Sequence, residues 1–309
     1  MLVHIIIDYS FLYYKYKFAL DSGRMTRLSA PFDVGGVMVE RDISQIYYSL
    51  REIEGFRKDW EKAGHDVVIS VCFDMPTDRK RSGEAGAEKY KSNRTKLGDT
   101  DFENIGIVKS ILDEAGYNTY KYDGYEADDL IYHLVNATSD KFNATIIVTP
   151  DADVLVNIKP GVVSHRYKSS KGYTAVTVDN FEKYLSEEMK CTVPYNSLML
   201  FKCTVGDKSD CIDGIKKFGP KAFDKLVSYL NTLGINWSVC GTYEATKSIL
   251  TKLGEVGYFD SDKLSQAEAS LNLVRPKVVT FDMPFPANKS DGDKRCKAYM
   301  KYNMRSLTI

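Results

Sequence analysis

Four short apolar runs, each followed closely by an aspartate, constrain the fold of this chain most strongly. Runs of this length, with valine and isoleucine prominent, are typical of strands buried on both faces of a sheet. Segments with helical spacing lie between them, at 42–63 and 100–115 among others. This alternation predicts a mainly parallel sheet flanked by helices and joined by right-handed crossovers. The apolar runs span 2–7, 66–73, 118–122 and 144–149.

Acidic residues lie where these predicted strands end. Asp8, Asp74 and Asp151 follow three of the runs. Ligands of open α/β sheets bind beyond the carboxyl ends of the strands, so side chains far apart in the sequence should meet along one edge. The strand order therefore predicts a single acidic site at that edge of the sheet.

Three clusters of acidic residues extend the same pattern. They lie at 124–129, 149–153 and 206–210. Carboxylates repel one another, and gathering them in one place is costly unless cations neutralise them. Oxygen ligands favour Mg²⁺ or Mn²⁺, and a pair of such ions suits phosphodiester hydrolysis. Taken singly, each cluster also fits an acidic turn or the charge at a helix N-terminus.

Basic residues are concentrated in one part of a chain that has no net charge. The 42 Lys and Arg residues equal the 42 Asp and Glu residues, so the total charge does not favour a polyanionic partner. The segment 79–96 is nevertheless basic, and in it Tyr90 lies beside Lys91 and near Arg94. An aromatic ring next to two cations suits a nucleic-acid strand, although a solvated helix face is the alternative. The basic tail from Lys289 is expected to be a solvated terminus.

Cysteine spacing and hydropathy indicate the compartment. The six cysteines show neither a paired spacing nor a metal-type arrangement with the four histidines, which favours reduced thiols in a cytoplasmic protein. No apolar stretch approaches the roughly 18 residues of a membrane helix, and 2–7 is too short for a signal sequence. No membrane partner is expected.

The pattern becomes helical near residue 180, which predicts an α/β part (1–180) and a helical part (181–309). Just before this boundary, 161–178 is typical of a β-hairpin. In the helical part, 214–222 combines two glycines, several lysines and a proline suited to the first position of a helix. Such a turn can present backbone N–H groups and lysines to phosphates, and an ordinary helix connection is equally compatible. The residues concerned are Gly214, Lys216, Lys217, Gly219 and Lys221.

Taken together and in order, these motifs resemble the 5′-nuclease superfamily. That superfamily includes flap endonucleases, the 5′-exonuclease domains of bacterial DNA polymerases and phage RNase H-type enzymes, and the compact phage enzymes are the most similar in spacing. The resemblance implies a PIN-like α/β domain and a helical C-terminal subdomain with a helix-three-turn-helix at about 198–232. The matching elements are Asp8, Phe73-Asp74, Tyr90-Lys91-x-x-Arg94, 125–129, 149–153 and 206–210.

The resemblance also implies roles for individual residues. The first metal ion would be held by Asp8, Asp74, Glu126 and Asp128. The second would be held by Asp151, Asp153 and Asp210, with Asp128 bridging and Asp129 and Asp207 in support. Lys91 and Arg94 would approach the scissile phosphate, and Tyr90 would stack near the 5′ end. The segment 79–98, with Arg79, Lys80 and Arg81, would form an arch over a single-stranded 5′ end.

The segment 206–222 would bind duplex phosphates around a K⁺ ion held by backbone carbonyls. The sequence departs from the family pattern at Cys211 and Asp213, where Asn and Pro are usual, and at Lys217, where Gly is common. Near Asn157 a Gln is usual. These departures leave every expected metal ligand in place.

The expected function is that of a two-metal 5′ nuclease acting on branched or nicked duplex DNA and on RNA:DNA hybrids. The expected biology is removal of primers or flaps in phage DNA replication, by a monomer in the cytoplasm of the infected cell. A single-strand-binding protein or a sliding clamp is a possible partner. The alternatives are a PIN-type ribonuclease, a phosphatase that uses Asp151 and Asp153, and a catalytically silent DNA-binding scaffold.

Overall fold

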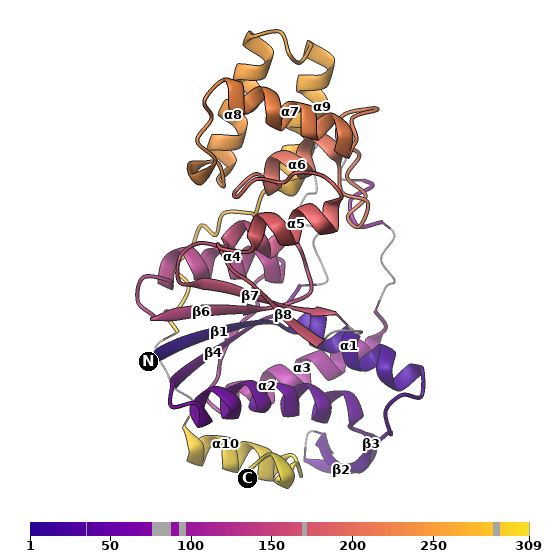
Figure 1. Cartoon of the computed structure of the whole chain (residues 1–309). Coiled ribbons are helices and arrows are strands. Elements are labelled where there is room, and N and C mark those ends of the chain that lie inside the picture. The colour runs from indigo at the N-terminus through magenta and orange to yellow at the C-terminus, as the bar shows by residue number, and fades with distance from the viewer. Residues whose placement is uncertain (35, 76–87, 93–96, 169–171, 287–290, 309) are drawn as a thin grey trace.

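The computed structural model describes residues 1–34, 36–75, 88–92, 97–168, 172–286 and 291–308. A six-stranded sheet in the order β5-β4-β1-β6-β7-β8 forms the centre of the α/β half (Figure 1). The pairs are parallel except β7 with β8, so the expected mainly parallel sheet is confirmed. The strands are β1 (Leu2–Asp8), β4 (Asp66–Cys72), β5 (Asn118–Tyr120), β6 (Ala144–Val148), β7 (Val162–Lys168) and β8 (Gly172–Val176).

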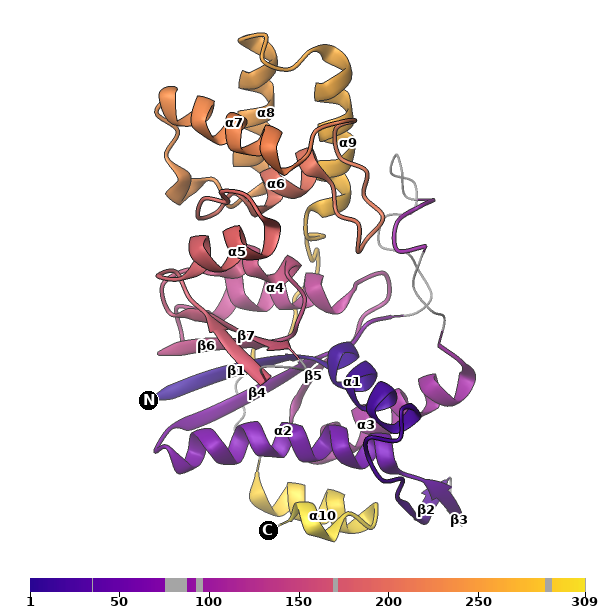
Figure 2. The same cartoon turned by 45° about the vertical axis from the view of Figure 1, so that its right-hand side comes forward.

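Helices cover both faces of this sheet. Helices α1 (Tyr9–Asp21), α2 (Ser44–Lys62) and α3 (Asp99–Glu114) lie on one side, and α4 (Ala127–Thr138) lies on the other (Figures 1 and 2). Alternate residues of a strand pack against the helices on the two opposite faces of the sheet.

In β1, Ile5 and Ile7 pack in the core shared with α2 and α3, whereas Ile6 packs in the core shared with α4. Each such side chain contributes about 1.5–3 kcal/mol by leaving water. This two-sided burial explains why the strands are continuous apolar runs.

A second sheet is not apparent from the sequence pattern. Strands β2 (Ser29–Val34) and β3 (Val37–Asp42) form an antiparallel pair between α1 and α2. Most of β3 is exposed, including Val37 and Met38. Because the strand lacks a buried face along its length, its sequence carries no alternation of apolar and polar residues.

The helical half has a core of its own. Helix α5 (Phe181–Met189) leads into it from the α/β half, and Phe181 and Leu185 belong to this second core. Phe201 and Phe223 meet there edge to face, with 5.1 Å between the ring centroids. Its other helices are α6 (Leu198–Val205), α7 (Pro220–Thr232), α8 (Tyr243–Glu255) and α9 (Ser261–Val274). Helices α5 to α9 all lie in the segment 181–309, whose pattern predicts helices.

The chain then returns to the α/β half. Helix α10 (Gly292–Lys301) packs beneath α2 and α3, and Tyr299 is fully buried (Figure 1). The Tyr299 hydroxyl donates a hydrogen bond of 2.6 Å to Glu54, which also accepts from Tyr117 and pairs with Arg57. The expectation of a solvated C-terminal tail is therefore wrong for residues 291–308, because alternate sides of this segment carry apolar and basic residues.

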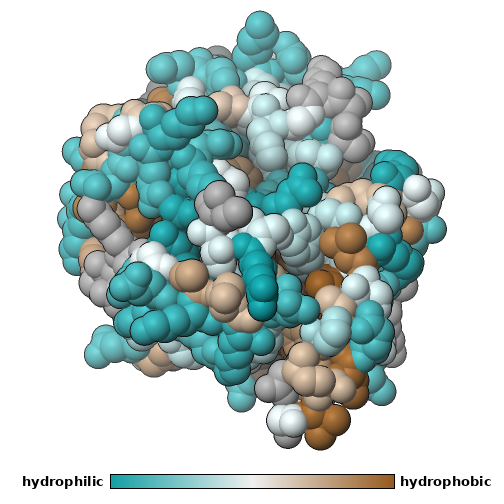
Figure 3. Space-filling view, turned by 90° about the horizontal axis from the view of Figure 1, so that it is seen from below, coloured by the Kyte–Doolittle hydropathy of each residue, from teal (hydrophilic) through white to brown (hydrophobic). Residues whose placement is uncertain are grey.

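Seen from the α10 side, the surface is mainly hydrophilic, with hydrophobic side chains gathered toward one edge (Figure 3). In the parts of the chain that the structure describes, none of the helices combines the length and the apolar character needed to cross a bilayer.

Buried His4 predicts a pH dependence of stability. Its Nε2 lies 2.7 Å from the Ser70 hydroxyl, and burial lowers its pKa to about 3. The unfolded chain binds a proton at His4 below pH about 6.5, whereas the folded chain does not until pH approaches 3, so stability falls as the pH falls through this window. Between pH 7 and 5.5 the native protein should lose about 1 kcal/mol more unfolding free energy than a His4→Gln variant. Urea unfolding at both pH values measures this difference, and equal losses in the two proteins would contradict it.

Candidate active site

The carboxyl ends of β1, β4 and β6 border a cavity of about 1070 Å³. The acidic side chains that line it come from β1, from the residues after β4 and β6, from α4, from α5 and from the turn after α6. They are Asp8, Asp74, Asp128, Asp151, Glu188, Asp207 and Asp210. The basic side chains that line the cavity include Lys91 and Lys202. Residues that the sequence places far apart are thus brought to one edge of the sheet.

Asp8 joins the sheet to the first helix. Its Oδ1 accepts hydrogen bonds from the backbone N–H groups of Ser10 and Phe11, so the carboxylate caps α1. Its Oδ2 accepts from the Thr149 hydroxyl at 2.9 Å. Burial, followed by repulsion from Asp74, raises the pKa of Asp8 to about 7, although the Thr149 hydrogen bond opposes this shift. The cavity is therefore short of positive charge around Asp8.

Asp74 fixes the start of α4. Its Oδ1 accepts from the backbone N–H of Ala127 at 2.7 Å, and its Oδ2 accepts from the Ser10 hydroxyl at 2.6 Å. A carboxylate at this place also interacts favourably with the positive end of the helix. Helix α4 begins at Ala127 and carries Asp128 into the cavity wall.

Asp129 lies apart from the other acidic residues of the cluster 124–129. It is fully buried, does not line the cavity, and accepts backbone hydrogen bonds from Glu126 and Lys277. Its position agrees with a supporting role and not with a side chain that faces a metal ion.

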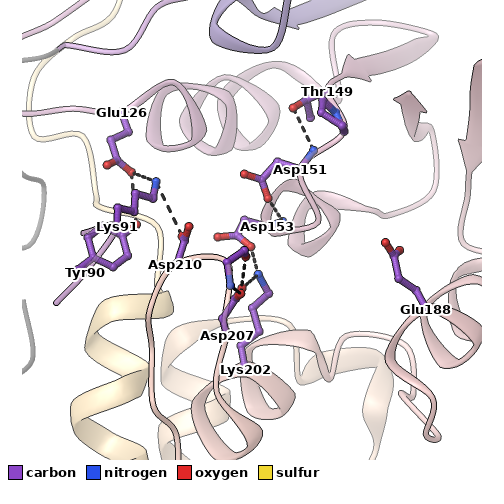
Figure 4. A network of polar contacts seen from close by, with 12 residues as sticks. Tyr90, Lys91, Glu126, Thr149, Asp151, Asp153, Glu188, Lys202, Asp207 and Asp210 are labelled. Atoms are coloured by element: carbon purple, nitrogen blue, oxygen red, sulfur yellow. Dashed lines mark hydrogen bonds and ion pairs between the residues drawn. The ribbon is translucent and has the colours of Figure 1, made fainter. Parts of the chain in front are cut away.

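Lys202 and Lys91 neutralise four of the carboxylates (Figure 4). Lys202 Nζ contacts both Asp153 and Asp207. Burial would raise the pKa of Asp207, but Lys202 and Ser209 hold it below its usual value. Lys91 Nζ lies 2.8 Å from Glu126 and 3.8 Å from Asp210.

Burial opposes the charge of Lys91, but Glu126, Tyr90 and Asp210 raise its pKa well above the usual value. The site is thus arranged around two internal ammonium groups.

This pairing explains a further property of the site. Within the described ranges, no group of three or more Asp, Glu, His or Cys side chains is arranged to hold a metal ion. Lys91 and Lys202 occupy oxygens of Glu126, Asp153, Asp207 and Asp210, and backbone or hydroxyl donors occupy oxygens of Asp8 and Asp74.

Two residues that support the cavity carboxylates are not predicted by the sequence pattern. Lys202 is a lone lysine in the otherwise apolar stretch of α6, five positions before Asp207, and that isolation is the signal that could have revealed it. Arg166 of β7 donates from Nε to the Pro150 carbonyl at 3.1 Å and pairs with Glu188. It holds the loop that carries Asp151, and no local motif distinguishes it.

The predicted arch is described only in part. Arg79, Lys80, Arg81 and Arg94 lie outside the described residues. Tyr90 is 3% exposed, and its ring packs against Ile212 and Leu273. Stacking of a nucleotide base on Tyr90 would therefore require the ring to leave this position.

The turn between α6 and α7 is built around two glycines. Gly206 and Gly214 have positive φ angles, and the two ends of the turn lie close together there. A Cβ on Gly206 would lie within 3 Å of backbone atoms of 212–213, and one on Gly214 within 3 Å of backbone atoms of 204–206. Asp207 and Ile212 form a β-bridge between them. Lys217 also has a positive φ, of 62°. Glycine, which is common at this position in the family that the motifs resemble, adopts this conformation without steric strain. Gly219 and Pro220 begin α7, and the side chains of Lys216, Lys217 and Lys221 are exposed.

Comparisons with known proteins agree with this arrangement. A DNA polymerase I from Caldicellulosiruptor bescii is 26% identical over 245 residues, which cover 78% of this chain and 26% of the polymerase. A 5′-3′ exonuclease from Aquifex aeolicus is 33% identical over 172 residues, which cover 55% of this chain and 56% of that protein. The chain thus spans about a quarter of the polymerase and about half of the exonuclease.

A structure of a T5 5′-exonuclease variant has a similar fold, with a TM-score of 0.53 at 11% identity over 99% of this chain and 89% of that one. The family model for the N-terminal, resolvase-like domain of 5′-3′ exonucleases matches residues 4–186, which is more than half of the chain. The resemblance seen in the sequence motifs is confirmed: the chain belongs to the 5′-3′ exonuclease family.

Proposed function

We propose that this chain is a metal-dependent 5′ nuclease that hydrolyses phosphodiesters near the 5′ ends or flap junctions of duplex DNA and RNA:DNA hybrids. The observation that carries the proposal is the cavity at the sheet edge, where seven carboxylates from separate parts of the chain line one space together with lysines that include Lys91 and Lys202. Membership of the 5′-3′ exonuclease family supports the same reaction. Removal of primers or flaps during phage DNA replication is the biological role we infer.

The carboxylate oxygens in the cavity are hard metal ligands, which fit Mg²⁺, with Mn²⁺ as a substitute. The raised pKa of Asp8 indicates that the site favours added positive charge. When bound, such ions would lower the pKa of an attacking water and neutralise charge on the phosphate. One ion would be held by Asp8, Asp74, Glu126 and Asp128, and the second by Asp151, Asp153 and Asp210, with Asp207 in support.

The two buried lysines would respond to these ions. Lys202 would release Asp153, and Lys91 would release Glu126 and Asp210, so that their oxygens become available. Lys91 could then approach the scissile phosphate and stabilise developing negative charge. Its place at the cavity wall supports this role. Arg94 would act beside it in an arch that 79–98 would form, as would Tyr90 once its ring leaves Ile212 and Leu273.

The turn after α6 would bind the duplex. Lys216, Lys217 and Lys221 are exposed near the N-terminal end of α7, where backbone N–H groups and the helix dipole favour phosphate. Gly214 lets the turn close against Gly206, and Gly219 has open space beside its backbone at the start of α7. A K⁺ ion at this turn is part of the proposal. A separate phosphate-binding turn of this kind favours a duplex nuclease over a PIN-type ribonuclease.

Removal of a cavity carboxylate should abolish cleavage. Asp151→Ala should leave DNA binding within about tenfold, because phosphate contacts of the lysines supply most of the affinity. Labelled 5′-flap, nicked, blunt and hybrid substrates should be compared in Mg²⁺ and in EDTA. The control is Asp179→Ala, which removes an exposed carboxylate outside the cavity. Turnover near that of the native protein in Asp151→Ala would refute the proposed metal role.

Removal of an internal cation should make the protein depend on divalent ions for stability. Lys202→Met leaves Asp153 and Asp207 without their buried partner and should lower the unfolding free energy in EDTA by about 3 kcal/mol. Mn²⁺ should restore more of the unfolding free energy in the variant than it adds to the native protein. Urea unfolding with and without Mn²⁺ measures both values, and exposed Lys183→Met is the control. Equal Mn²⁺ stabilisation of Lys202→Met and the native protein would count against a shared site.

Removal of the exposed lysines should weaken duplex binding and its salt dependence. Lys216→Gln combined with Lys217→Gln should reduce the slope of log affinity against log salt by about one unit for each phosphate that the protein no longer neutralises. Fluorescence anisotropy with catalytically inactive protein over a salt series gives the slope. Lys247→Gln with Lys252→Gln on α8 is the matched control, because both lysines are exposed on the same half of the chain. An unchanged slope would remove the duplex-binding role from this turn.

A further inference from the structure

The segment 275–286, which we name the return segment, leads from α9 back to the α/β half. It passes beside α4 in both views of the chain (Figures 1 and 2). It lies outside the part of the chain that the family model matches. Tyr120 and Tyr125 donate hydrogen bonds from their hydroxyls to the Pro284 and Val278 carbonyls, at 3.0 and 3.5 Å. The return segment is therefore attached to the end of β5 and to the loop that precedes α4.

Lys277 makes the most specific contacts of this segment. Its backbone N–H donates to Asp129 Oδ1 at 2.6 Å, and its Nζ donates to the Gly124 carbonyl at 3.0 Å. The same ammonium group lies 4.7 Å from the centre of the Tyr125 ring. One residue of the return segment thus holds both the first turn of α4 and the loop that leads into it.

Asp129 transmits this attachment to the active site. Its second oxygen, Oδ2, accepts from the backbone N–H of Glu126 at 3.1 Å, which closes a capping box at the start of α4. The carboxylate is completely buried, so these hydrogen bonds form where water does not compete for them. Glu126 and Asp128, on either side of this capped turn, are the residues whose carboxylates face Lys91 and the cavity.

We propose that Asp129 and the backbone N–H of Lys277 are positioning residues, through which the return segment sets the orientation of Glu126 and Asp128. The proposal rests on the proposed function for its consequence in catalysis. A carboxylate suits the task because it accepts from two N–H donors at once, whereas an amide offers one oxygen and turns a donor toward the other N–H. Partners that orient metal-binding residues typically change metal affinity or activity by 10–100-fold when they are lost.

The test is Asp129→Asn, which changes the hydrogen bonding with almost no change in shape. We expect Mn²⁺ binding to the metal-free protein, measured by calorimetry, to weaken by about tenfold or more. With DNA substrate, kcat should fall while KM stays within about twofold, because the phosphate contacts are made elsewhere. Asp123→Asn in the same loop is exposed and is the matched control, expected to behave like the native protein.

A second variant tests the return segment directly. Lys277→Pro removes the N–H that bonds Asp129, together with the side-chain contacts to Gly124 and Tyr125. Lys277→Ala removes those side-chain contacts but keeps the N–H, and is the reference for the cycle. Relative to Lys277→Ala, a double-mutant cycle of Lys277→Pro with Asp129→Asn should be strongly non-additive, since both changes break the same hydrogen bond. If Asp129→Asn does not fold, as judged by urea unfolding, Lys277→Pro alone decides the question. Native Mn²⁺ affinity and native kcat in a folded Asp129→Asn or Lys277→Pro protein, or full additivity of the two changes, would overturn the proposal. A native protein that binds Mn²⁺ but cuts none of the substrates would contradict the proposed function alone, because the calorimetric comparison does not depend on cleavage.

Discussion

The mutual repulsion of carboxylates at the edge of a buried sheet is the constraint on which this structure depends. Seven of them line one cavity, and burial together with Asp74 raises the pKa of Asp8 to about 7. Such a cluster stays folded only if positive charge or hydrogen-bond donors approach each carboxylate. Lys91 and Lys202 supply the charge, and the N-terminal ends of α1 and α4 supply backbone donors. The elements around the cavity can be understood as the means of meeting this requirement.

The same groups connect folding to the proposed chemistry. A carboxylate that caps a helix is held in one orientation, so Asp8 and Asp74 are placed by the helices they begin. A carboxylate paired with a lysine is held less permanently, because a side-chain ammonium can turn away without disturbing the backbone. The fixed acids Asp8 and Asp74 therefore form a rigid part near the sheet. The lysine-paired acids form an exchangeable part, which comprises Glu126 at the start of α4 and the acids near α6.

Local patterns in the sequence predict the α/β half well. Both faces of the sheet are buried, so β1, β4 and β6 are apolar runs, and the aspartates after them predict the place of the site. Local patterns fail where a residue acts through distant contacts. Lys202 is visible only as an interruption of an apolar helix, and the burial of Tyr90 depends on Ile212 and Leu273, which lie far along the chain. The return segment also lacks a strong pattern, and its hydrogen bond to Asp129 joins residues 148 positions apart.

The packing of α10 has a consequence for the order in which the molecule can be assembled. The hydrogen bond between Tyr299 and Glu54 joins residues 245 positions apart, with the whole helical half between them. Closing so long a loop costs chain entropy before any contact repays it, and contacts of this separation form late and slow folding. The layer beneath the sheet therefore reaches its full core only after the chain has returned from the helical half, and compact helices between the two ends shorten the loop that must be closed. Unfolding of the helical half by heat, or its cleavage by a protease, should accordingly weaken the packing of α10 beneath the sheet.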